Sequence, residues 1–106
     1  MKKVQIHPVT RKSIKDFPKN VKIELGAFIM GLQIGVEIPI HVIKPMKTIA
    51  IGVCELRIKD SDGIYRVFYY TKLEDRILIF HAFQKKTQKT EKRDIDIAKK
   101  RLKEML

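Results

Sequence analysis

Three apolar runs separated by short turns constrain the fold of this chain more than any other feature of its sequence. The runs cover Ile49–Lys59, Ile64–Leu73 and Arg76–Phe83, and they are rich in residues that favour β-strands. The first turn, Asp60–Gly63, combines aspartates, a serine and a glycine, which are typical turn residues. Because the connections are short, consecutive strands should pair antiparallel, and the sequence predicts a three-stranded meander.

Apolar residues at helical spacing lie on both sides of these strands. Before them, Thr10 is placed to cap a helix that runs to about Phe17, and Pro18 separates it from a longer helix that ends near Gly35. After them, the spacing predicts a C-terminal helix that begins at the capping residue Thr90.

The remaining segments complete the predicted fold. Val4–His7 alternates and is stopped by a proline, which is typical of an edge strand, whereas residues 36–47 contain two prolines and are predicted to be an irregular link. We therefore predict an α+β fold in one domain that spans residues 1–106. It consists of an N-terminal helical pair packed on a small antiparallel sheet, followed by a C-terminal helix.

The charge of the chain indicates the class of partner. Lysines and arginines number 23 against 12 aspartates and glutamates, which gives a formal net charge of +11. A small domain this basic usually binds a polyanion or an acidic protein, and nucleic acid is the commoner case. Membrane binding is not expected, because the basic residues are spread over several elements and no apolar stretch is long enough to span a bilayer.

The cysteine count and the absence of an apolar leader indicate the compartment. Cys54 is the only cysteine, so an internal disulfide is impossible, and the sequence predicts a reducing cytoplasmic location. The three histidines are far apart in sequence and no cluster has metal-ligand spacing, so we expect no metal or other cofactor.

Basic residues of the central strands are predicted to share one face of the sheet. Side chains alternate along a strand, so Arg57 and Lys59 point away from the apolar face, and Arg66 lies just across the turn from them. If helices cover only the apolar face, these cations stand on an open face. The segment after the third run would extend this surface with Phe83, Lys85, Lys86, Gln88 and Lys89. Cations interleaved with aromatic rings suit unstacked RNA bases and phosphates.

Each of these features also has a purely structural interpretation. Arg57 and Lys59 are equally compatible with the polar face of a half-exposed strand, and the lysine-rich segment after Phe83 with a solvated loop. His81 lies within an apolar strand, which favours a buried histidine with satisfied hydrogen bonds. Nothing distinguishes His7 or His41 in the sequence.

Four segments together resemble a known family. They are Val53–Lys59, Ile64–Tyr69, Leu78–Thr90 and Ala98–Arg101, and they carry an ELR, a YR and an F-x-K-K-T-x-K-T block in this order. In this respect the chain resembles the phage-derived branch of the RelE/HigB toxin superfamily over about residues 44–106. The resemblance implies a type II toxin–antitoxin toxin that cleaves messenger RNA, in many members only in the A site of the small ribosomal subunit. It also implies a cognate antitoxin, often with a helix-turn-helix domain.

The resemblance implies roles for individual residues. Matching basic positions assign catalytic roles to Arg57, Lys59, Arg66, Lys86 and, as the one suitably placed histidine, His81. Phe83, Lys85, Gln88 and Lys89 would hold RNA. RelE members also use a C-terminal tyrosine, but this chain has no tyrosine after Tyr70, so that role is vacant.

A metal-independent mechanism follows from these assignments. The ribose 2′-hydroxyl attacks the adjacent phosphate, and Arg57, Arg66 and Lys86 neutralise the charge that builds on the phosphorane. Neighbouring cations would favour the neutral amine of Lys59, which is then the expected general base, with His81 as the alternative.

Two functions of other classes remain open. The same fold serves ParE-type toxins, which inhibit gyrase without cutting RNA, although such a toxin has no need for the cations at Arg57, Arg66 and Lys86. The chain is also compatible with a non-catalytic module that binds RNA or the ribosome. The vacant tyrosine role favours that interpretation.

Overall fold

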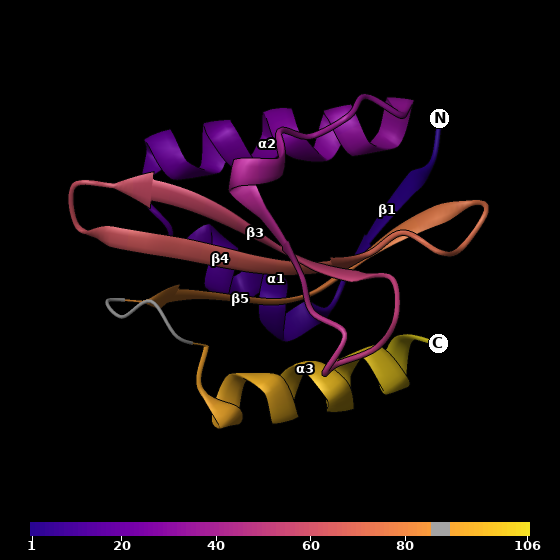
Figure 1. The fold of residues 1–106 in the computed structure, drawn as a ribbon. Coiled ribbons are helices and arrows are strands. Elements are labelled where there is room, and N and C mark those ends of the chain that lie inside the picture. The colour runs from indigo at the N-terminus through magenta and orange to yellow at the C-terminus, as the bar shows by residue number, and fades with distance from the viewer. Residues whose placement is uncertain (86–89) are drawn as a thin grey trace.

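The computed structural model describes residues 1–85 and 90–106, which form a five-stranded sheet with helices on both faces (Figure 1). The strands are β1 (Lys3–Ile6), β2 (Ile43–Pro45), β3 (Val53–Asp60), β4 (Gly63–Tyr70) and β5 (Arg76–Lys85). The helices are α1 (Pro8–Lys15), α2 (Lys19–Ile34) and α3 (Lys92–Met105), with a short 3-10 helix, η1 (Ile40–Val42). None of the described helices is both long and apolar enough to cross a membrane.

The order of strands in the sheet is β1-β5-β4-β3-β2. The strands β3, β4 and β5 form the predicted antiparallel meander, and the turn at residues 60–63 joins the first two. β1 lies at an edge, as predicted, but it runs parallel to β5. β2 extends the other edge by pairing antiparallel with the first half of β3, through Ile43↔Leu56 to Pro45↔Cys54.

The α+β class is confirmed, whereas the predicted arrangement of helices on a small antiparallel sheet is wrong. The sheet is mixed and has five strands, because β1 adds a parallel neighbour and the link at residues 36–47 contains η1 and β2. The two N-terminal helices also do not act as one pair: α1 packs mainly on β5, whereas α2 packs mainly on β3.

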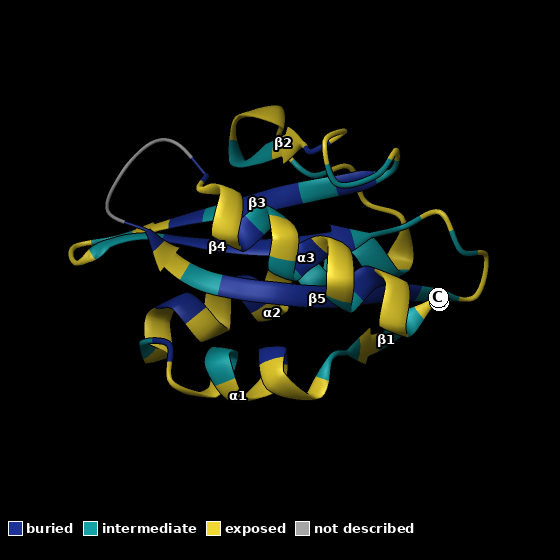
Figure 2. Cartoon of the chain, turned by 90° about the horizontal axis from the view of Figure 1, so that it is seen from below, coloured by how far each residue is buried: buried dark blue, intermediate teal, exposed yellow. Residues whose placement is uncertain are grey.

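Two apolar clusters cover opposite faces of the sheet. On the face of α1 and α2, Val21 and Leu25 pack against Leu56, Ile58 and other strand residues. On the second face, Ala98 and Leu102 of α3 pack against strand residues that include Phe68 and Phe80. Seen from the α3 side, buried residues run along the strands beneath exposed outer turns of α3 (Figure 2). The face expected to be open is therefore partly covered by α3.

The helix ends follow local chemistry. Gly35 ends α2 with a φ of +81°, a left-handed conformation that glycine adopts without the cost of a Cβ clash, and this confirms the predicted end. α1 begins earlier than predicted, with Pro8 in its first turn and the Nδ1 atom of His7 accepting the N–H of Val9 at 3.3 Å. Thr10 is therefore not a cap; it is buried inside the helix.

Candidate nucleic-acid interface

The strand register aligns polar residues in three rows on the α3 face. Residues directly opposite each other on paired strands point to the same face of a sheet. The first row crosses β2, β3, β4 and β5, and the others cross β3, β4 and β5. The rows are Lys44–Glu55–Phe68–His81, Arg57–Arg66–Phe83 and Lys59–Ile64–Lys85. Sheet pairing thus brings most of the predicted site residues into one region, as the sequence suggested.

A fully buried carboxylate lies at the centre of the first group, the Glu55 cluster, which comprises Glu55, Arg57, Arg66 and Thr90. Oε2 of Glu55 accepts the Thr90 hydroxyl at 2.8 Å, and Oε1 accepts Nε of Arg57 at 2.9 Å. Nη1 of Arg66 donates to Oγ1 of Thr90 at 2.9 Å and lies 3.4 Å from Oε1 of Glu55. One negative and two positive charges therefore share this cluster, which leaves it net cationic.

Solvent reaches the Glu55 cluster through Arg57. The side chains of Glu55 and Arg66 have no exposed surface, whereas 28% of the Arg57 side chain is exposed. Its Nε atom is held by Glu55, which fixes the direction of the guanidinium group. Lys44 and Lys59, in the flanking rows, are exposed. This part of the face therefore presents cations that an anionic ligand can reach.

The second group, the His81 cluster, comprises His81, Lys85, Asp94 and Arg101 and ties β5 to α3. Nη1 of Arg101 lies 3.1 Å from Nδ1 of His81, and Nε2 of His81 lies 3.0 Å from Oδ1 of Asp94. Because arginine only donates, Nδ1 must accept, and the ring proton on Nε2 points to Asp94. Burial lowers the pKa of His81 and the Arg101 charge lowers it further, although the Asp94 hydrogen bond opposes them. A neutral histidine with both nitrogens bonded results.

Two more residues near the end of β5, Lys85 and Phe83, also contact neighbouring side chains on this face. Nζ of Lys85 lies 3.0 Å from Oε1 of Glu91 and 3.9 Å from Oδ2 of Asp94, and its side chain is only 7% exposed. The hydrogen bond and charge of Lys85 lower the pKa of Glu91. The half-buried ring of Phe83 stacks on His81, with centroids 4.8 Å apart. Lys85 and Phe83 thus pack under and beside the start of α3.

The predicted site residues therefore fall into three groups. Arg57 and Lys59 are accessible to solvent. Arg66 and Lys85 are buried, so the expectation that they stand on an open surface is wrong; α3 covers this part of the face. His81 is also buried, and both of its ring nitrogens are hydrogen-bonded, as its place in an apolar strand favoured. Lys86, Gln88 and Lys89 lie outside the described residues. Thr90 does not cap α3: the capping residue is Glu91, and the Thr90 hydroxyl serves the Glu55 cluster instead.

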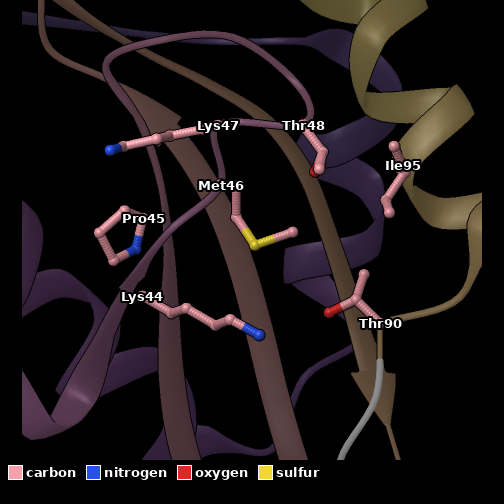
Figure 3. A pocket seen from close by; sticks show the side chains of 7 residues that line it. All are labelled: Lys44, Pro45, Met46, Lys47, Thr48, Thr90 and Ile95. Atoms are coloured by element: carbon pink, nitrogen blue, oxygen red, sulfur yellow. The ribbon is translucent and has the colours of Figure 1, made fainter.

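A cavity of about 570 Å³ opens beside the Glu55 cluster (Figure 3). Lys44 and Thr90 extend toward each other from opposite walls, Met46 lies above them in this view, and Lys47 points away. The described residues that line this cavity include lysines but no acidic residue: Lys44, Pro45, Met46, Lys47, Thr48, Thr90 and Ile95. The sequence did not point to Lys44, because β2 has only three residues and two prolines lie in or near it. The pairing of Lys44 with Glu55 in the sheet is what places Lys44 here.

A second cavity, of about 420 Å³, lies at the free edge of β3 and shares Arg57 with the Glu55 cluster. It is lined by Glu24 of α2, His41 and Val42 of η1, Arg57 and Lys59 of β3, and Ile64 of β4. The sequence did not distinguish His41, because the charged residues that share this cavity lie 16 or more positions away along the chain. No local pattern links residues at that separation. In the part of the chain that the structure describes, no group of three His, Cys, Asp or Glu residues is placed to hold a metal ion.

Comparison with known proteins identifies the family. Residues 12–103 match the family model described as phage derived protein Gp49-like. The chain belongs to this Gp49-like family. No curated protein matches significantly. Among solved structures, the Gp49-like chain is similar to a chain of the toxin–antitoxin complex RelBE2 from Mycobacterium tuberculosis, with a TM-score of 0.56 and 19% identity. The match covers 79% of this chain and 98% of that one, and at this identity it shows a shared fold.

Proposed function

We propose that this Gp49-like chain is the toxin of a toxin–antitoxin pair and that it cleaves messenger RNA without a metal ion, on the ribosome. Two findings support the toxin assignment: the family match and the fold shared with a chain of a toxin–antitoxin complex. The net charge of +11 suits both proposed partners, since ribosomal RNA is a polyanion and an acidic antitoxin segment would neutralise the same cations. A helix-turn-helix domain in the antitoxin is part of the proposal.

The observation that carries the proposal of RNA cleavage is the partly exposed side chain of Arg57. Glu55 holds its Nε atom, so the group is oriented before a ligand arrives. Exposed Lys44 and Lys59 lie in the rows on either side of Arg57. A fixed guanidinium fork between two exposed lysines is suited to a phosphodiester whose negative charge increases during reaction.

The proposed reaction is transphosphorylation. The 2′-oxygen forms a bond to phosphorus while the bond from phosphorus to the 5′-oxygen breaks, which yields a cyclic phosphate and a 5′-hydroxyl end. Arg57 and Lys86 contact the phosphate oxygens, and Lys59 is the proposed general base that takes the proton of the 2′-hydroxyl. Arg66 and His81 are buried, so we assign them positioning roles, Arg66 behind Arg57 and His81 beneath α3.

Burial also favours a second candidate function, binding of RNA or the ribosome without cleavage. Three of the predicted site residues, Arg66, His81 and Lys85, are buried inside the Glu55 and His81 clusters. A binding module needs only the accessible cations, whereas catalysis also needs a base and an acid. A cleavage assay separates the two functions.

The test compares two arginine variants in a translation mixture programmed with one message, with cleavage mapped by primer extension. Arg57→Ala should lower the cleavage rate about 100-fold, because one preorganised charge is lost from the transition state. Arg11→Ala removes the same charge from the exposed surface of α1 and should cut at the wild-type rate. Equal rates for the wild type and Arg57→Ala would refute the assignment of Arg57. A wild-type chain that protects but does not cut the message would support the binding function instead.

A further inference from the structure

The cavity at the free edge of β3 joins ionisable side chains from three elements. β2 pairs only with Cys54–Leu56, so the second half of β3 has no strand neighbour on that side among the described residues. η1 and α2 both pack against β3 and form the other walls. The cavity brings Glu24 and exposed His41 together with Arg57 and Lys59, the two accessible residues of the proposed RNA site.

The proposed cleavage still needs a group that donates a proton to the leaving oxygen, and this cavity contains a histidine. When the bond from phosphorus to the 5′-oxygen breaks, the oxygen leaves with the electron pair and must take up a proton. The guanidinium of Arg57 does not give up a proton in a protein, and Lys59 is used as the base. A histidine exchanges protons near neutral pH and is the residue type most often used for this step.

The other two histidines are not placed for this role. His81 is buried, and both of its ring nitrogens are bonded within the His81 cluster. His7 caps α1 through Nδ1, and its Nε2 lies 3.4 Å from Glu104 of α3. His41 lines the same cavity as Arg57 and Lys59.

We infer that His41 is the general acid of the cleavage reaction and gives its proton to the 5′-oxygen as that oxygen leaves. The inference rests on the proposed function. The substrate segment is the scissile phosphodiester, with the phosphate on Arg57 and the leaving nucleoside toward η1. The groups that face His41 across the cavity are Glu24, Arg57 and Lys59. Glu24 is the acidic residue of this lining, and the two cations attract the phosphate.

The first test replaces His41 and follows the pH dependence of cleavage on programmed ribosomes. His41→Ala should lower kcat about 100-fold with little change in KM. Because an acid must be protonated, the wild-type rate should fall on the alkaline side of its optimum, and the variant should lose that fall while keeping the rise on the acidic side. His7→Ala, in a histidine outside both proposed sites, should keep the wild-type rate and profile.

The second test separates proton donation from a structural role. A message in which sulfur replaces the bridging 5′-oxygen at the cleaved bond has a leaving group that departs without protonation. His41→Ala should cut this message at nearly the wild-type rate. If the variant cuts both messages equally slowly, or cuts the ordinary message at the wild-type rate, His41 is not the acid while the RNase proposal stands. If the wild-type chain cuts neither message, the proposed function fails together with the inference.

Discussion

The Glu55 cluster and the His81 cluster lie on the same face of the sheet, yet only the first is open to a ligand. In the Glu55 cluster, Arg57 projects to solvent from the edge half of β3, beyond the reach of α3. In the His81 cluster, Asp94 and Arg101 of α3 take both ring nitrogens of the histidine, and Lys85 pairs with Glu91 and Asp94. What covers a cation on a sheet face therefore decides whether a ligand can reach it or whether it braces a helix.

Removing the central carboxylate should produce the largest effect on stability. Glu55→Gln keeps the shape of the side chain but removes the negative charge that Arg57 and Arg66 contact. Because the position has no exposed surface, we expect a loss of about 3–5 kcal/mol in the free energy of unfolding, measured by urea denaturation. Glu74→Gln, at an exposed position, should change it by less than about 0.5 kcal/mol. A similar small loss in both variants would show that the Glu55 cluster does not brace the sheet.

The His81 cluster should make stability depend on pH. The pKa of His81 in the folded chain lies below the ordinary value of 6.5, so the unfolded chain takes up a proton first as pH falls. The contribution of neutral His81 to the free energy of unfolding is complete above about pH 6.5. Below that pH the contribution decreases by up to about 1.4 kcal/mol per pH unit. Unfolding measured between pH 7 and pH 5 should show this slope in the wild type, and His81→Gln should flatten it. The slope should persist in His7→Gln; its disappearance there would place the titrating group elsewhere.

The smallest expected effect is on RNA affinity, and the test compares an exposed lysine with a buried one. Lys59→Met removes an exposed cation, and we expect binding of a short single-stranded RNA to weaken about fivefold at 0.1 M salt, with the salt slope reduced by about 1. Lys85→Met removes a lysine already paired with Glu91, so its effect on RNA affinity should be less than half as large. Fluorescence anisotropy at several salt concentrations measures both. Equal losses would mean that Lys85 leaves its ion pairs to bind RNA.

Local patterns in the sequence account for most elements of the fold. The meander β3–β4–β5 follows from strand-favouring runs joined by a turn-forming tetrapeptide, and the end of α2 follows from Gly35. Strand alternation placed Arg57 and Lys59 on the correct face, because side chains alternate whatever lies above them. These signals depend on neighbours within a few residues, and a single sequence contains all of them.

Long-range packing decided the rest. A three-residue strand such as β2 has too little local signal, and it exists because Ile43–Pro45 pair with β3. The parallel pairing of β1 with β5 joins residues more than 70 positions apart. The packing of α3 on the sheet buries Arg66, His81 and Lys85. The packing of η1 against β3 brings His41 into one cavity with Arg57. The sequence by itself determined which residues could carry charge and protons and on which strands they stand. Only the tertiary structure decided which of them solvent can reach, because burial depends on segments far away in the chain.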